Sequence, residues 1–91
     1  MPKLLHEYWE NEDGGEFGPV QERADQMRPD LMPGSHFVFE IWASSWQQAM
    51  QTHNERLSYG DYQPADGVPD HFYTVEEQIA QDAYLLRRNV R

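Results

Sequence analysis

The chain has 91 residues, which is the length of one small domain. Sixteen acidic side chains against seven Lys and Arg give a formal net charge of −9, which argues against direct binding to nucleic-acid phosphates or to an anionic membrane surface. The chain has no cysteine, so disulfides, thiol chemistry and cysteine-ligated metals are excluded. No apolar run has signal-peptide or membrane-spanning length, and we therefore expect a cytoplasmic protein.

The N-terminal third predicts a strand, a turn and a short helix. Residues 3–10 (KLLHEYWE) alternate between two faces, one of them carrying Leu5, Glu7 and Trp9. The Gly-rich stretch 11–15 (NEDGG) is a strong turn signal, and residues 17–18 can continue from it as extended chain. Pro19 suits the first position of a helix, which we expect to end before Pro29. Its apolar residues would be Val20, Ala24 and Met27.

The centre of the chain predicts one strand that leads directly into one helix. In residues 36–43 (HFVFEIWA), β-branched and aromatic side chains alternate with a period of two, which places Phe37, Phe39 and Ile41 on one face. Ser45 can cap the helix that follows, with Gln48 three residues later. Its apolar stripe consists of Trp46, Ala49, Met50, His53 and Leu57, and Gly60 would end it.

The C-terminal third predicts a long loop and a second amphipathic helix. Residues 59–71 hold two Pro and two Gly, and we expect this loop to pack on the body through Tyr59 and Tyr62. Residues 72–73 can form a brief edge strand. Thr74 and Glu77 form a capping-box pattern. The expected buried stripe of this helix is Val75, Ile79, Ala83, Leu86 and Val90.

These elements predict a single α+β domain that covers residues 1–91. Its sheet would have two or three strands, packed by two longer helices and one short helix. An antiparallel arrangement is favoured, because a two-stranded parallel sheet in so small a domain would lack cover.

Catalytic and metal motifs are absent from the sequence. No zinc spacing, phosphate-binding glycine loop or nucleophile elbow occurs, and the acidic turn fails the EF-hand pattern. His53 lies on an apolar helical stripe, where a hydrogen-bonded core histidine is expected. A small hydrolase or metal site around Asp70, His71 and the acidic turn is the remote alternative. We therefore predict a protein that is not an enzyme and uses no cofactor.

The aromatic residues point instead to a protein-interaction module, such as an accessory, adaptor or inhibitor protein. If the second face of the central strand is uncovered, Val38 and Trp42 form an exposed apolar patch beside Glu40. The alternative is that a helix or the 59–71 loop covers this second face of the strand. The predicted partner-binding residues are Trp42, Val38, Glu40, Trp9, Tyr59 and Tyr62.

The acidic residues offer a second hypothesis. Residues 4–22 and 57–86 each hold six acids and no Lys or Arg. Such blocks usually form a solvated face, but they also suit an acidic decoy that occupies a nucleic-acid-binding protein. In either case we expect a protein partner of unknown identity, and the acidic surface is compatible with a basic one. A homodimer is a further alternative.

Overall fold

The computed structural model describes residues 1–90 and consists of one three-stranded antiparallel sheet with three helices. The sheet order is β2-β1-β3, so the first strand is central. The strands are β1 (Leu4–Asn11), β2 (Gly14–Pro19) and β3 (His36–Ala43), and the helices are α1 (Glu22–Leu31), α2 (Trp46–Arg56) and α3 (Val75–Arg87). This arrangement confirms the predicted α+β class and antiparallel pairing.

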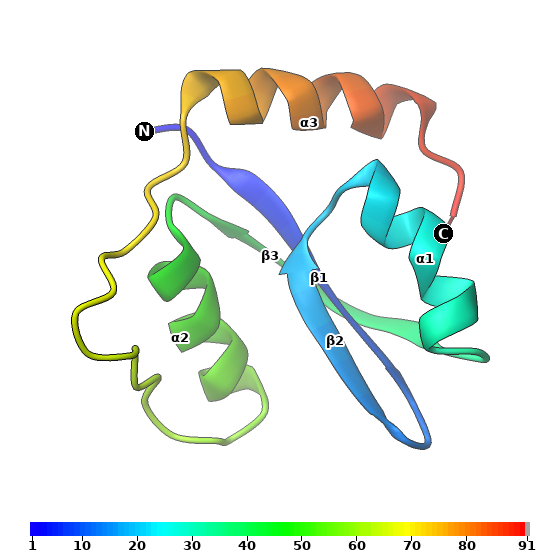
Figure 1. The fold of residues 1–91 in the computed structure, drawn as a ribbon, viewed down its shortest axis with the longest axis horizontal. Coiled ribbons are helices and arrows are strands. Elements are labelled where there is room, and N and C mark those ends of the chain that lie inside the picture. The colour runs from blue at the N-terminus through cyan, green and yellow to red at the C-terminus, as the bar shows by residue number, and fades with distance from the viewer. Residues whose placement is uncertain (91) are drawn as a thin grey trace.

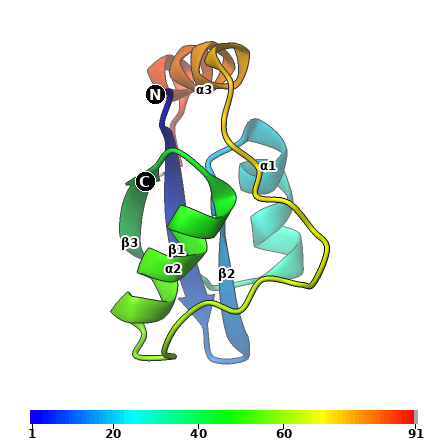
Figure 2. The same ribbon diagram turned by 90° about the vertical axis from the view of Figure 1, so that its left-hand side faces the viewer.

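Helices cover both faces of the sheet. In Figure 1, α2 and α1 flank the strands on opposite sides and α3 runs across one end, and Figure 2 shows the same separation after a quarter turn. On the α2 side, Ile41, Ala43 and Ala49 are buried together. On the other side, Leu5 and Val20 pack with α3. The central strand is therefore buried on both faces.

The hairpin of β1 and β2 begins the fold. The Asn11 side chain accepts hydrogen bonds from the backbone N–H groups of Asp13 and Gly14, at 2.9 and 3.1 Å, which fixes the predicted turn. The Tyr8 ring lies against Gly15, where a Cβ atom would approach the Tyr8 hydroxyl to 2.2 Å. A side chain at position 15 would therefore displace this buried ring.

Helix α1 differs from the prediction. It begins at Glu22 because Pro19 is the last residue of β2 and pairs with His6. Pro29 lies inside the helix, which continues to Leu31. The buried residues of α1 are Asp25 and Arg28, which form an ion pair with each other, so its inward face is charged and the apolar face expected for it was wrong.

Strand β3 has the predicted bounds, but its alternation is interrupted. Tyr8 pairs with Phe39 and Trp9 pairs with Phe37, so the register skips Val38. Phe37 consequently shares a face with Trp9, at 6.1 Å between ring centroids, and does not share the face of Phe39 as predicted.

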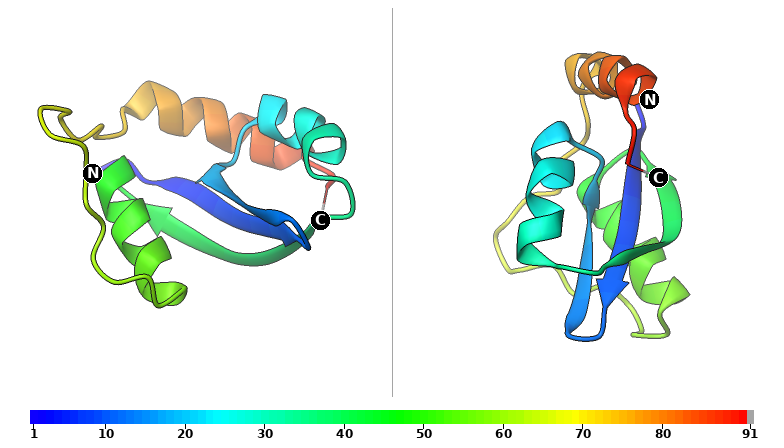
Figure 3. Two further views of the ribbon diagram at one scale, coloured as in Figure 1. Left: turned by 60° about the horizontal axis from the view of Figure 1, so that its bottom comes forward. Right: turned by 90° about the vertical axis from the view of Figure 1, so that its right-hand side faces the viewer.

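The helix that follows β3 starts as predicted, because the Ser45 hydroxyl accepts from the backbone N–H of Gln48 at 3.1 Å. It ends at Arg56, before Gly60, and Ser58 has a positive φ. Figure 3 shows the long segment that leads from α2 past the outside of the sheet to α3.

His6 is fully buried between the sheet and the segment before α3. Its Nδ1 atom lies 3.0 and 3.3 Å from the carbonyl oxygens of Leu4 and Ile41. A ring nitrogen facing two carbonyls must carry a hydrogen, so Nε2 accepts the Tyr73 hydroxyl at 2.6 Å. Burial lowers the pKa of His6, although these backbone contacts partly oppose the shift. The imidazole is therefore neutral at pH 7.

We expect His6 to make the protein less stable in mild acid. Below pH 6.5 His6 becomes protonated in the unfolded chain but stays neutral in the folded protein. The free energy of unfolding should therefore fall by up to about 1.4 kcal/mol for each unit by which the pH is lowered. Urea unfolding at pH 7.5 and pH 5.5 measures this fall. In the variant His6→Gln the fall should be smaller, and an equal fall in both proteins would contradict the assignment.

Candidate interaction surface

Helix α3 is turned the opposite way from the prediction. Its capping box is present as expected, with Glu77 N–H bound to the Thr74 hydroxyl at 3.2 Å and Thr74 N–H bound to the Glu77 carboxylate at 2.9 Å. The expected core residues Val75, Ile79 and Leu86 are, however, 55, 62 and 92 % exposed. The same correction applies to Ala83 and Val90, which are also exposed. The buried residues of α3 are Gln81 and Tyr84.

Gln81 explains part of this orientation. Strand β2 ends opposite His6, so the backbone of Leu5 extends past the end of that ladder. The Gln81 side chain accepts the Leu5 N–H at 2.7 Å and donates to the Leu5 and Val20 carbonyls at 2.9 and 3.2 Å. One amide side chain thus gives the Leu5 N–H a partner and also bonds the Val20 carbonyl, while the Val20 N–H itself donates to the Leu5 carbonyl at 2.9 Å. An apolar residue at this position could not satisfy these buried groups.

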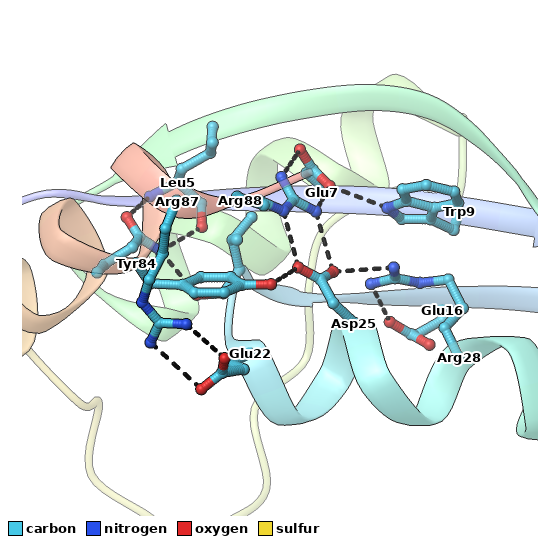
Figure 4. A network of polar contacts seen from close by, with 12 residues as sticks. Leu5, Glu7, Trp9, Glu16, Glu22, Asp25, Arg28, Tyr84, Arg87 and Arg88 are labelled. Carbon is cyan, nitrogen blue, oxygen red and sulfur yellow. Dashed lines mark hydrogen bonds and ion pairs between the residues drawn. The ribbon is translucent and has the colours of Figure 1, made fainter. Parts of the chain in front are cut away.

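A buried ionic cluster holds the C-terminal end of α3. Arg88 donates to both carboxylate oxygens of Glu7 at 2.7 and 2.6 Å and to Asp25 at 2.7 and 3.0 Å (Figure 4). These three side chains are 8 % exposed or less. Asp25 also accepts the Tyr84 hydroxyl and the Arg28 guanidinium, and Glu7 accepts the Trp9 indole N–H at 3.0 Å. Residues from β1, α1 and the end of α3 are therefore joined in one network.

The network is charged and almost fully hydrogen-bonded, with Arg28 Nε as the one buried side-chain atom of residues 1–90 that lacks a hydrogen-bond partner. Burial alone would raise the pKa of Asp25, but hydrogen bonds from Arg88, Tyr84 and Arg28 outweigh it and hold that pKa below its ordinary value. The hydrogen bond to Glu7 raises the pKa of Arg88. Burial and the neighbouring Asp25 raise the pKa of Tyr84. These shifts keep Asp25 ionised and keep Tyr84 and Arg88 protonated at neutral pH, which suits a structural clamp.

The polar contacts leave an apolar helix face in solvent. We call Val75, Ile79, Ala83 and Leu86 the outer face of α3. Their spacing of four, four and three residues places them along one side of the helix. Phe72, just before the helix, is also 57 % exposed. A contiguous apolar stripe of this kind is typical of a contact surface.

The six predicted partner-binding residues do not form one surface, because three of them lie together on β3 and three lie elsewhere. On β3, Val38 and Trp42 are 39 and 52 % exposed and Glu40 is exposed with them. Trp42 pairs with Leu5, the residue that Gln81 holds, so this patch lies on the strand beside the one that α3 covers. We call Val38, Glu40 and Trp42 the β3 patch.

The other three predicted residues are not part of the β3 patch. Trp9 is buried, with the Arg28 guanidinium 4.2 Å above its ring. Tyr59 is 67 % exposed and Tyr62 is half-buried, and both lie on the α2 side of the sheet. There Tyr59 contacts His53, and the Tyr62 N–H donates to Gln51 at 2.9 Å. The expected packing of the loop through Tyr59 is therefore weak.

Asp70 and His71, the residues of the remote catalytic or metal hypothesis, contact the N-terminal ends of two helices. Asp70 accepts the backbone N–H of Gln47 at the start of α2, at 2.9 Å. His71 lies 3.0 Å from the Glu77 carboxylate at the start of α3, where the capping bond from the Thr74 N–H and then the His71 contact lower the pKa of Glu77. Buried His53 bonds Asn54 at 2.9 Å, as the prediction of a core histidine required. Within residues 1–90, no group of three His, Asp or Glu could hold a metal ion.

A cavity of about 340 Å³ lies between α3 and the segment joining β2 to α1. Its polar wall residues already have partners: Gln81 binds the β1 backbone, Tyr84 binds Asp25, and Arg87 binds Glu22 at 2.5 Å. The cavity therefore offers few free groups to a ligand. Of the helices formed by residues 1–90, none has the length and apolar character needed to cross a membrane.

Comparison with known proteins provides no relative for this chain. No protein-family model matches the sequence, and neither the curated proteins nor the solved structures include a significant match.

Proposed function

We propose that this protein is a non-enzymatic interaction module of the cytoplasm, which binds a protein partner through the outer face of α3 and the β3 patch. The observation that carries the proposal is the orientation of α3, whose polar side is buried while Ile79 and Leu86 stand in solvent. Full burial of one such side chain contributes about 1.5–3 kcal/mol. A partner that covers this stripe would gain that contribution from several residues.

The β3 patch would add an aromatic anchor and an acidic rim as a second point of contact. Trp42 is half exposed on an edge strand, and Glu40 stands next to it along the same face of β3. Exposed tryptophans are frequent hot spots of protein interfaces. Glu40 gives the rim the negative charge that was expected to accompany the aromatic residues.

The acidic-decoy hypothesis has weaker support. Glu7, one of the six acids of residues 4–22, is buried against Arg88, so it cannot face a basic partner. The apolar outer face of α3 also has no role in a purely electrostatic mimic. Binding through an apolar stripe should survive high salt, whereas binding of a decoy would weaken steeply as salt screens the charges.

Affinity capture from a lysate at low and high salt, read by mass spectrometry, tests the proposed function. Partners retained by the native bait at both salt concentrations should be lost with Ile79→Asp and weakened with Trp42→Ala. Val68→Asp is the matched control, because Val68 is 61 % exposed in the loop and Ile79 is 62 % exposed on α3. If all four baits capture the same proteins in equal amounts, the proposed surface is wrong.

A further inference from the structure

We propose that the outer face of α3 pairs with the same face of a second copy of this chain, with the two helices antiparallel. This inference rests on the proposed function, because it names the occupant of that surface. The stripe from Val75 to Leu86 is self-complementary in an antiparallel pair, since its centre lies between Ile79 and Ala83. Val75 of one copy would then meet Leu86 of the other, as a two-fold interface requires.

The side chains along the stripe suit close helix packing. Ala83 is small and lies next to the centre, where two helices approach most closely. The larger Val75 and Leu86 lie at the two ends, where each would fill the space beside the other. In the monomer these two residues are 55 and 92 % exposed, so pairing removes apolar surface from water without disturbing the existing core.

Charge on this face also favours a second copy. At about 100° of rotation per residue, Glu76 and Arg87 lie on the same flank of the stripe, near opposite ends of the helix. An antiparallel pair places Glu76 of each copy beside Arg87 of the other, and it opposes the two helix dipoles favourably. The Arg87 side chain is 59 % exposed beside its present partner Glu22.

A basic partner fits this face less well than a second copy does. The chain carries a net charge of −9, but the exposed charged residues that flank the stripe are two acids and one base, Glu76, Asp82 and Arg87. Most of the acidic charge lies elsewhere, for example on the hairpin turn at Glu12 and Asp13. The stripe is therefore nearly neutral and self-complementary, whereas a basic surface would be drawn to other parts of the molecule.

Asp82 sets the expected strength of the dimer. It lies on the other flank near the centre, so a two-fold axis brings the two Asp82 carboxylates to the same side of the interface. Two like charges at that place weaken the pair. A helix of 13 residues is about 20 Å long, so the buried area is below that of a standard interface. We expect a dimer that dissociates on dilution.

Sedimentation equilibrium over a range of protein concentrations tests this inference. The native chain should shift from monomer to dimer as concentration rises. Leu86→Glu should weaken dimerisation at least tenfold, and Asp82→Asn should strengthen it several-fold. Val68→Glu, in an exposed loop, should leave the dissociation constant unchanged. Leu86 is almost fully exposed, so its variant keeps the fold, which circular dichroism verifies.

Cysteine crosslinking tests the direction of pairing, because the chain has no cysteine of its own. A mixture of Val75→Cys and Leu86→Cys should form a mixed disulfide under mild oxidation, whereas each variant alone should not crosslink. In an antiparallel pair the two positions 75 lie about 16 Å apart along the helices. Crosslinking of each variant with itself in place of the mixed product would overturn the antiparallel arrangement.

The proposed function and this inference can fail separately. A native chain that stays monomeric at every concentration overturns self-pairing. If partner capture still depends on Ile79 in that case, the stripe serves a different protein and the proposed function stands. If capture is also unaffected by Ile79→Asp, both proposals are wrong.

Discussion

Replacing Arg88 by alanine is expected to reduce the free energy of unfolding by about 3–5 kcal/mol. The arginine neutralises two carboxylates, Glu7 and Asp25, whose side chains are each 2 % exposed. Without it, the two buried carboxylates lose the cation that they share. Asp25 keeps its ion pair with Arg28, whereas Glu7 loses its ion pair with Arg88. Small domains have only about 5–15 kcal/mol of stability in total, so this loss would remove a large part of it. Urea unfolding at pH 7 measures the change.

The neighbouring arginine provides the control. Arg87 forms an ion pair with Glu22 at the surface, and both of its partner's oxygens remain in water when the arginine is removed. Arg87→Ala should therefore cost much less stability than Arg88→Ala, although both variants lose the same charge. Equal losses would show that net charge, and not burial of the network, determines the effect. The double variant with Glu7→Gln and Arg88→Met should recover part of the loss, because it removes one of the two buried negative charges that Arg88 compensated.

Local patterns in the sequence predicted β1, β3 and the starts of α2 and α3, but not the extent of β2 or the start of α1. The bounds of β3 follow from the alternation of residues 36–43, and Ser45 and Thr74 begin their helices with the expected hydrogen bonds. Each of these features depends on residues within a few positions of one another. The exposure of Trp42 was one of two outcomes left open by the sequence, and the structure decided it because no helix covers that part of β3.

The inward faces of α1 and α3 could not be predicted in the same way. An apolar stripe normally faces the core, and on that rule Ile79 and Met27 were expected inside. What decides the orientation is a set of partners distant in the chain, such as Gln81 with Leu5, 76 residues apart, and Arg88 with Glu7, 81 residues apart. Neither helix sequence indicates which strand the helix meets.

The candidate interaction surface was consequently found only in part. The β3 patch was predicted from the alternation of one strand, but the outer face of α3 was assigned to the core. Trp9 was expected at the surface, yet α1 brings Arg28 over its ring and the Glu7 carboxylate binds its indole. The one local hint was the spacing of Gln81, Tyr84 and Arg88, three polar-tipped side chains on one helical side, which indicates a polar contact with another element.

Gln81→Leu is expected to destabilise the fold by about 1–3 kcal/mol, although it places a more apolar residue at a buried position. Leucine cannot accept the hydrogen of Leu5 N–H, which then lies buried without a partner. The Leu5 carbonyl keeps its bond from Val20 N–H at 2.9 Å, whereas the Leu5 N–H and the Val20 carbonyl lose their bonds to Gln81. Hydrogen exchange measured residue by residue should therefore show Leu5 N–H losing protection by more than the global change in stability.

Gln78→Leu is the matched control for this variant, because Gln78 lies one turn earlier on α3 and is only half-buried. It changes the same side chain without removing a bond to β1, so stability should stay nearly constant and Leu5 N–H should remain protected. A stabilised Gln81→Leu variant would mean that apolar packing, and not hydrogen bonding to Leu5, holds α3 on the sheet. In that case the exposure of Ile79 and Leu86 would need another cause, since the polar contacts would no longer determine which side of the helix faces inward.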